Sequence, residues 1–252
     1  MLMNSSKNMQ NKKIFLTGAT SGIGFSIAKI YLKNNWKVVG LGRNLDNLLE
    51  LKKEYPDKLD IYQIELLNFE NSKKLIKDIF INHQDIDTFI LNAGIYIPDT
   101  YKEINFENSK KTFETNVLIN YLILEILKEN ITIQKHHTIG IVSSVAGYRG
   151  LARSVTYGPT KAALINLAES LKIELNCNVK LINPGFVDTP ATKINKFKMP
   201  FIIPPEVAAQ AIFEKIYKAG FEISFPFPFN FMMKFASILP YNLYFKIAKK
   251  FQ

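Results

Sequence analysis

The sequence predicts a single α/β domain built on a doubly wound sheet of about seven parallel strands, with helices on both faces. Apolar runs of strand length alternate with segments of helical periodicity from Lys13 to Phe225. These runs are nearly continuous, as expected for strands that are buried on both faces. A glycine-rich turn follows the first run and opens the first helical segment. No internal linker or repeat divides the chain, so one domain is predicted.

The elements follow one another in strict alternation. Strands are predicted at residues 13–17, 36–41, 59–64, 86–91, 137–143, 179–182 and 222–225. Helices are predicted at residues 22–34, 45–55, 68–82, 106–130, 154–175 and 205–219. The first helix has isoleucines at helical spacing along one face, and Pro56 ends the second. Helices between parallel strands serve as the crossovers that such a sheet requires. A flexible N-terminus is predicted for residues 1–11. The domain itself is predicted to span residues 12–226, and residues 227–252 are predicted to form an aromatic-rich helical extension of it.

The bulk composition excludes several classes of protein. The net charge is +10, but only three of the basic residues are arginines and the lysines are scattered, a pattern that does not favour nucleic-acid binding. The single cysteine, Cys177, cannot form an internal disulfide and indicates a reducing, cytoplasmic location. Met1–Lys13 is polar and does not resemble a signal peptide, and no apolar run is long enough to span a membrane. The three histidines have no partners at ligand spacing, so no metal site is expected.

The glycine-rich turn has the features of a phosphate-binding loop. It reads Thr17-Gly-Ala-Thr-Ser-Gly-Ile-Gly24, with glycines at 18, 22 and 24. Glycine permits a tight turn and close approach of the backbone to a pyrophosphate. The helix that begins here offers free N–H groups and the positive end of its dipole to an anion.

A second pattern carries proton-transfer chemistry. Tyr157 and Lys161 are four residues apart, so on a helix both side chains leave the same face. An ammonium beside a phenol favours the phenolate, which would let Tyr157 exchange a proton near neutral pH. Ser144 lies upstream at the end of a predicted strand, where its hydroxyl could hold a substrate oxygen. A tyrosine and a lysine at this spacing are expected by chance about once in a chain of this composition, so the motif gains weight only from its context.

The order of motifs resembles the short-chain dehydrogenase/reductase family, from residue 12 to about 225. The glycine loop is similar to the family's TGxxxGxG signature. Asn92-Ala-Gly94 resembles its NNAG turn, with Leu91 in place of the first Asn. Val142-Ser-Ser-Val-Ala-Gly147 resembles the serine motif, Tyr157-Gly-Pro-Thr-Lys161 the YxxxK motif, and Asn183-Pro-Gly-Phe-Val-Asp-Thr189 the PGxVxT turn.

The resemblance implies a Rossmann-type fold and a set of site residues. The implied catalytic residues are Asn116, Ser144, Tyr157 and Lys161, with Ser143 as the alternative serine. Tyr157 and Lys161 also contact the coenzyme in such enzymes. The other implied coenzyme-binding residues are Gly18, Thr20, Ser21, Gly22, Ile23, Gly24, Arg43, Glu65, Leu66, Asn92, Ala93, Gly94, Pro184, Gly185, Val187 and Thr189.

The residue after the second strand selects the coenzyme. A carboxylate there would hydrogen-bond the adenosine ribose and repel a 2′-phosphate, but the sequence has Gly42, Arg43 and Asn44. Arg43 could fork onto a 2′-phosphate and stack on adenine, which predicts NADP(H). Glu65-Leu66 stands where the family has Asp-Val at the adenine amino group.

The predicted function is reduction of a small or lipophilic carbonyl compound to an alcohol by NADPH, or the reverse, with Tyr157 as general acid or base. Three segments would shape the substrate pocket: Ile95–Tyr101, Ala146–Thr156 and Pro190–Pro204. Two alternatives stay open, a regulator or scaffold that binds NADP(H) without turnover and an enzyme of NAD-linked alcohol oxidation. A homodimer or homotetramer is implied, and the apolar positions Ile119, Leu122, Ile126, Ile165, Ala168 and Leu171 are expected to exceed what the sheet covers.

The C-terminal extension combines aromatic residues with lysines. Its first half carries Phe227, Phe229, Phe231, Met232, Met233 and Phe235, and its second half predicts a helix after Pro240 with Tyr241, Tyr244, Phe245 and Ala248 on one face. Ordinary packing is the favoured interpretation, as a wall of the substrate pocket or an oligomer interface. Lys246, Lys249 and Lys250 lie largely off that face, which leaves peripheral membrane contact as the less favoured alternative.

Overall fold

A computed structural model describes residues 12–195 and 199–251 of the chain. It contains a seven-stranded sheet in the order β3-β2-β1-β4-β5-β6-β7, in which every neighbouring pair is parallel. The strands are β1 Lys13–Thr17, β2 Lys37–Gly42, β3 Leu59–Gln63, β4 Thr88–Leu91, β5 Thr138–Val142, β6 Asn178–Pro184 and β7 Glu222–Phe225. The predicted doubly wound α/β fold is therefore confirmed. The flexible segment predicted for residues 1–11 lies outside the described residues.

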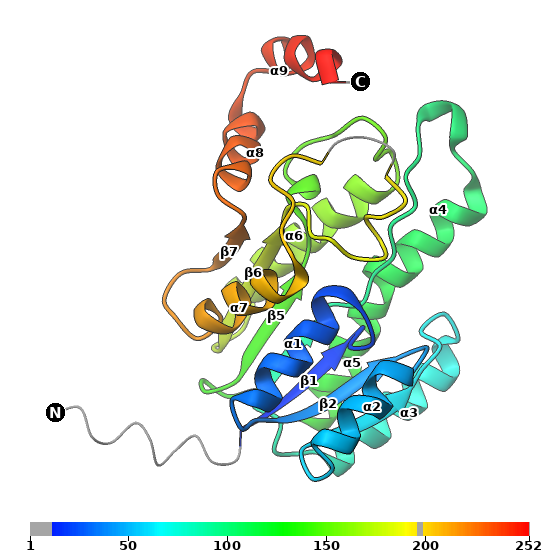
Figure 1. Ribbon diagram of the computed structural model, residues 1–252, viewed down its shortest axis with the longest axis vertical. Coiled ribbons are helices and arrows are strands. Elements are labelled where there is room, and N and C mark those ends of the chain that lie inside the picture. The colour runs from blue at the N-terminus through cyan, green and yellow to red at the C-terminus, as the bar shows by residue number, and fades with distance from the viewer. Residues whose placement is uncertain (1–11, 196–198, 252) are drawn as a thin grey trace, which may run out of the picture.

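Helices cover both faces of the sheet (Figure 1). They are α1 Gly22–Lys33, α2 Asp46–Glu54, α3 Phe69–Asn82, α4 Phe106–Phe113, α5 Ile119–Asn130, α6 Tyr157–Glu174, α7 Pro205–Lys215, α8 Phe229–Ile238 and α9 Tyr241–Ala248. Successive side chains of a strand point to opposite faces, and β1 shows the result. Phe15 packs among residues of α3, α5 and α6, whereas Ile14 and Leu16 pack among residues of α1 and α7. The inner strands are buried on both faces because each face has its own helical layer, whereas the edge strands β3 and β7 are only partly buried.

The sheet topology determines where a ligand can bind. β1 pairs with β2 on one side and with β4 on the other, so the chain reverses its direction of winding between β3 and β4. The loops after β1 and β4 therefore leave the sheet toward opposite faces and open a crevice at the carboxyl ends of the strands. The phosphate loop follows β1, and Asn92 follows β4 directly.

Two expectations about the long helices need correction. The predicted helix 154–175 begins only at Tyr157, because the Asp99 carboxylate holds the turn before it through the Thr156 N–H (3.0 Å) and hydroxyl (2.5 Å). The predicted surplus of apolar surface on the two helices was wrong at the named positions. Ile119, Ile126 and Ala168 are buried in the core, and Leu122, Ile165 and Leu171 pack against it.

The extension after β7 forms two short helices, α8 and α9, which lie above the body of the domain at the carboxyl-end side of the sheet (Figure 1). Many of its large apolar side chains are exposed, among them Phe231, Phe235 and Ile238. No helix in residues 12–195 and 199–251 is both long and apolar enough to cross a bilayer.

Candidate active site

A cavity of about 330 Å³ lies at the carboxyl ends of the strands. Loops after six different strands, β1 to β6, line it, together with the first turn of α6 and the start of α8. Every site residue predicted from the sequence borders this cavity except Asn116, which lies behind it. The fold thus brings together side chains that are far apart in the chain.

The phosphate loop forms the floor at the start of α1. Gly22 has a φ of +52°, and a Cβ there would lie 2.9 Å from Thr189 Cγ2, so only glycine fits without strain. At Gly24, a Cβ would come within 2.0 Å of the Gly18 carbonyl oxygen, because the loop folds tightly onto the helix. Ser21 precedes α1 without capping it through its side chain, which leaves the first N–H groups of the helix available to an anion.

The Asn92-Ala-Gly94 turn is bound to the phosphate loop. The Thr17 hydroxyl accepts hydrogen bonds from the N–H groups of Asn92 and Ala93, both at 3.0 Å. The Asn92 amide donates in return to the carbonyl oxygens of Thr17 (3.0 Å) and Gly18 (3.3 Å). These bonds join the ends of β1 and β4 and set the shape of the crevice between them.

Ser143 and Ser144 have different roles in the structure. The Ser143 hydroxyl is buried and donates to the Lys161 carbonyl oxygen at 2.7 Å, so it holds α6 against β5. The Ser144 hydroxyl borders the cavity, accepts from the Ala146 N–H at 3.1 Å and reaches the Pro184 carbonyl oxygen at 3.3 Å. The structure therefore favours Ser144 over Ser143 as the residue that can hold a substrate oxygen.

Tyr157 and Lys161 lie side by side in the first turns of α6. The Lys161 ammonium is 5.5 Å from the centre of the Tyr157 ring and donates to the Val142 carbonyl oxygen at 3.2 Å. Burial lowers the pKa of Lys161 to about 8. Burial also raises the pKa of Tyr157 well above its ordinary value, and a hydrogen bond with Ser144 opposes this only in part. The expectation that Lys161 lowers the Tyr157 pKa is thus corrected, because desolvation of the phenol outweighs any pull from the lysine.

Asn116 lies in a single π-helical turn, Glu114–Leu118, between α4 and α5. Its amide binds the backbone of Ile95 in both directions, accepting from the N–H at 2.7 Å and donating to the carbonyl at 3.0 Å. It also donates to the Thr160 hydroxyl at 3.1 Å, next to Lys161. π-Helical turns of this kind are frequent at functional sites. Asn116 therefore fixes the loop after β4 relative to α6.

Arg43 and Glu65 stand at the adenosine end of the cavity expected from the resemblance. Both are exposed and border the cavity. Arg43 follows β2 directly, and Glu65 follows β3 after one intervening residue. The Gln63 amide donates to the Arg43 carbonyl at 2.9 Å, which fixes the backbone while leaving the guanidinium at the cavity edge. Leu66 is half-buried beside them.

Four residues that the sequence did not single out as site residues shape the other end of the cavity. Tyr96 packs edge-on against Tyr157, with ring centres 4.8 Å apart, and its hydroxyl donates to Asn195 at 3.0 Å. Phe186 stacks on Phe229 at 5.2 Å, and both border the cavity. Tyr96 and Asn195 fall in segments that the sequence assigned to substrate selection. Phe229 confirms that the C-terminal extension contributes to the pocket wall.

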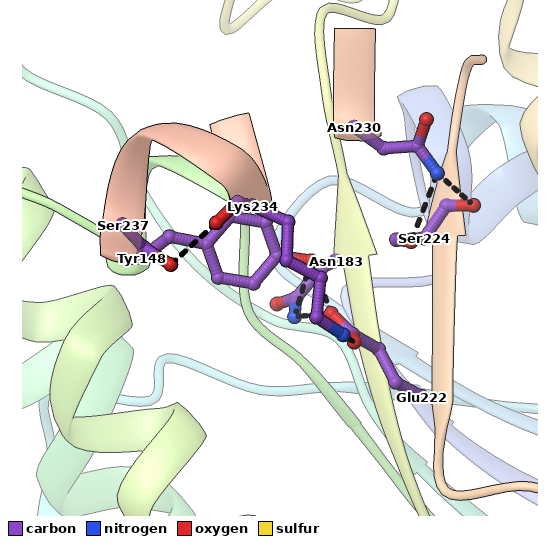
Figure 2. Close-up of polar contacts among 7 residues, drawn as sticks. All are labelled: Tyr148, Asn183, Glu222, Ser224, Asn230, Lys234 and Ser237. Carbon is purple, nitrogen blue, oxygen red and sulfur yellow. Dashed lines mark hydrogen bonds and ion pairs between the residues drawn. The ribbon is translucent and has the colours of Figure 1, made fainter. Parts of the chain in front are cut away.

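A polar network ties the extension to this site (Figure 2). Glu222 on β7 accepts from the Tyr148 hydroxyl, from the Asn183 amide at 2.8 Å and from the Lys234 ammonium on α8. Tyr148 follows the serine motif, and Asn183 precedes the turn at Pro184. The carboxylate thus links α8 to the loop after Ser144 and to the end of β6. These hydrogen bonds lower the pKa of Glu222 against the opposing effect of its burial.

Comparison with known proteins identifies the family. The model of the short chain dehydrogenase family matches residues 12–198. The chain belongs to the short-chain dehydrogenase/reductase family. It is 28% identical over 249 residues to an uncharacterized oxidoreductase of Myxococcus xanthus, across 96% of this chain and 98% of that protein. It is 33% identical over 196 residues to human dehydrogenase/reductase SDR family member 11, across 71% of this chain and 75% of that protein.

Solved structures agree on the fold of this short-chain dehydrogenase/reductase. A short-chain dehydrogenase from Sphingobium yanoikuyae superposes with a TM-score of 0.75 at 18% identity, covering 86% of this chain and 89% of that one. The protein is therefore an oxidoreductase of the class that acts on CH–OH or C=O groups with NAD(P). The family match ends at residue 198, so the C-terminal extension lies beyond it.

Proposed function

We propose that this protein is an NADP(H)-dependent reductase of a lipophilic carbonyl compound, or the dehydrogenase of the corresponding alcohol. The convergence of Tyr157, Ser144 and Lys161 on one cavity beside a glycine-rich phosphate loop carries this proposal. A protein that only bound the nucleotide would not need a phenol and a hydroxyl facing the same space. Their placement favours turnover over a regulatory or scaffold role.

A dinucleotide would lie along this cavity. Glycines at 18, 22 and 24 keep the phosphate loop and the start of α1 free of side chains, which suits a pyrophosphate. Pro184, Gly185 and Val187 would border the nicotinamide, and Lys161 would reach its ribose. Bound there, NADP(H) supplies or accepts the hydride at the carbonyl carbon.

The protonation states suit carbonyl reduction. Because burial raises the pKa of Tyr157, the phenol is protonated at neutral pH and can donate its proton to a developing alkoxide. The Ser144 hydroxyl would hold the same oxygen in line with the donor. Lys161, whose pKa is lowered to about 8, stays mostly cationic at neutral pH and would favour the phenolate that is left. Asn116 supports this arrangement through its hydrogen bonds with Ile95 and Thr160. The family resemblance further implies that Asn116 would hold a water through which the proton path reaches solvent.

Arg43 supports the choice of NADP(H) over NAD(H). Its guanidinium lies where a 2′-phosphate would approach, and no carboxylate follows β2 directly in the chain. Two structural neighbours point the same way, since one was solved in complex with NADPH and another with NADP bound.

The substrate end of the cavity is lined mainly by aromatic and aliphatic side chains, including Leu151, Phe186 and Phe229. A pocket of this kind selects an apolar body that carries one polar group at the catalytic end. We therefore propose a lipophilic aldehyde, ketone or quinone as the substrate class.

Consumption of NADPH across a panel of such aldehydes, ketones and quinones tests the proposal. Turnover of at least one lipophilic member is expected, with NADH much less effective. Tight NADPH binding without turnover of any panel member, in either direction, would favour the regulatory alternative. Turnover only of alcohols with NAD would favour the NAD-linked oxidation instead.

A further inference from the structure

Helix α8 is inverted with respect to an ordinary surface helix. Asn230 and Lys234 are spaced four residues apart, and their side chains contact β7 (Figure 2). The Asn230 amide donates to Ser224, and the half-exposed Lys234 pairs with Glu222. The backbone carbonyl of Ser237 accepts from Arg149 at 2.6 Å. A surface helix usually turns its apolar stripe inward and its polar residues outward. Here polar contacts hold the inner face.

The outward face of α8 is apolar. Phe231, Met232, Phe235 and Ile238 recur at helical spacing, and their exposed fractions are 65%, 54%, 55% and 76%. Such a stripe is far more apolar than a solvent-exposed face requires, and contiguous patches of this kind mark sites of interaction. Because the polar contacts fix the orientation of α8, the patch is presented in one defined direction.

Helix α9 is held to the same loop of the domain. The Arg149 guanidinium lies 4.5 Å from the ring centres of both Tyr241 and Tyr244, and the Tyr244 hydroxyl donates to the Gly150 carbonyl. Tyr244 is the anchor, since it is buried. Around it Tyr241, Leu243, Phe245 and Ile247 stay exposed. Exposed apolar side chains are therefore present on α9 as well as on α8.

The charge of this segment identifies its partner. Residues 223–252 contain four lysines, at 234, 246, 249 and 250, and no aspartate or glutamate. A two-fold contact with a second copy would bring two positive surfaces together, which is unfavourable. An anionic lipid surface offers opposite charge to the lysines and an apolar boundary layer to the phenylalanines.

The start of α8 borders the substrate end of the cavity. Phe229, its first residue, stacks on Phe186 inside the cavity and lies 6.4 Å, ring centre to ring centre, from the half-exposed Phe201. The helix that carries the outer patch therefore also supplies a wall of the pocket.

We propose that α8 and α9 form a docking surface for an anionic lipid bilayer, which places the mouth of the pocket at the membrane. The docking surface comprises Phe231, Met232, Phe235, Ile238, Tyr241, Leu243, Phe245 and Ile247, with the lysines of α9 and the residues after it. Docking itself is independent of the proposed enzymatic activity, because it is measured without turnover. Access of a lipophilic substrate from the bilayer is the part that rests on the proposed function.

Flotation of the full-length protein with vesicles tests the docking surface. The protein is expected to float with vesicles of phosphatidylcholine and phosphatidylglycerol, to bind pure phosphatidylcholine more weakly, and to dissociate as salt rises. The variant Phe231→Ser/Ile238→Ser should bind the anionic vesicles at least ~10-fold more weakly. The matched control Phe106→Ser/Ile173→Ser removes one Phe and one Ile that are 75% and 83% exposed elsewhere, and should bind like the parent.

A charge variant keeps the test decisive if the apolar variant does not fold. Lys246→Gln/Lys249→Gln/Lys250→Gln changes only exposed side chains and should lose the preference for phosphatidylglycerol. Lys74→Gln/Lys77→Gln/Lys128→Gln, on α3 and α5, is its control. Absence of vesicle binding by the parent protein would overturn the proposal. An equal loss of vesicle binding in a docking-surface variant and in its matched control would also overturn it. Loss of oligomeric mass in Phe231→Ser/Ile238→Ser, without vesicle binding by the parent, would assign the surface to a second copy.

Discussion

Buried Lys161 and half-buried Tyr157 lie together at the centre of the candidate active site. Lys161 is 3% exposed, and within the described residues the one hydrogen bond of its ammonium goes to a carbonyl oxygen rather than to a carboxylate. Burying a cation in this way costs stability, and the cost appears as the lowered pKa. Such a cost is tolerated where the group is needed for chemistry.

Replacing Lys161 by Met is therefore expected to stabilise the fold while abolishing activity. The gain in the free energy of unfolding at neutral pH should be roughly 1–3 kcal/mol. The unfolded lysine holds its proton up to about pH 10.5, whereas the folded one loses it at about pH 8. Parent stability thus rises between these values, and the advantage of Lys161→Met should shrink over the same interval. Thermal unfolding at a series of pH values measures this. An unchanged or lower melting temperature for the variant at pH 7 would contradict it.

Arg43 gives a second prediction at this scale. The variant Arg43→Ala should bind NADPH more weakly by ~1.5–3 kcal/mol, the size of a charge-assisted hydrogen bond, and bind NADH almost unchanged. Titration of both coenzymes into the parent and the variant provides the comparison, with Asn44→Ala, at the next exposed position, as the control. Equal affinity of the parent for the two coenzymes would exclude Arg43 as the discriminator.

Single residues were predictable from sequence where a backbone motif fixes their place. Gly22, Asn92 and Ser144 reach the cavity because each follows a strand end. Tyr96 and Phe229 were not singled out as site residues, because their positions depend on how distant loops pack. The pKa of Tyr157 was predicted in the wrong direction, because sequence shows a neighbouring charge but not the extent of burial.

At the scale of elements, Glu222 shows how short segments are joined. Its carboxylate accepts from three donors on three different segments, so its loss would leave Tyr148, Asn183 and Lys234 without a shared partner. The network connects β7 with the end of β6, α8 and the loop after Ser144.

The variant Glu222→Gln should lower the free energy of unfolding by ~1–3 kcal/mol at neutral pH, because an amide accepts fewer and weaker hydrogen bonds. The folded pKa of Glu222 lies below its ordinary 4.5, so its contribution is complete above that value and is lost as the pH falls through the folded pKa. The difference between parent and variant should therefore disappear in acid. Denaturant unfolding at neutral and acidic pH checks this, with the exposed Glu214→Gln as control. A difference that is independent of pH would argue against the role of the carboxylate charge.

Most elements were predictable because apolar periodicity dominates in a sheet that is buried on both faces. The π-helical turn at Asn116 was not, because the bonds to Ile95 that accompany it come from another loop. The orientation of α8 could not be predicted from the sequence either. Its apolar stripe predicted inward packing, but Glu222 and Ser224 bind the side chains of Lys234 and Asn230 instead, and Arg149 binds the backbone carbonyl of Ser237.

For the whole molecule we propose a homodimer or homotetramer, as the family resemblance implies. The apolar positions first expected at the interface are covered by the core, but Phe113, Leu118 and Tyr121 remain exposed on the α4–α5 helix. Light scattering at micromolar concentration should give a multiple of 28.8 kDa. Tyr121→Lys should reduce that mass, whereas Tyr101→Lys, exposed elsewhere, should not. A monomeric mass for the parent would contradict this proposal.

The most direct test of the catalytic centre compares the parent with Tyr157→Phe in NADPH-dependent turnover and NADPH binding. The variant keeps the half-buried ring and its packing against Tyr96 but loses the proton donor. We predict a fall in kcat of at least ~100-fold, with NADPH affinity nearly unchanged. A variant that keeps near-normal kcat would show that the proton comes from another group and that Tyr157 is not the general acid.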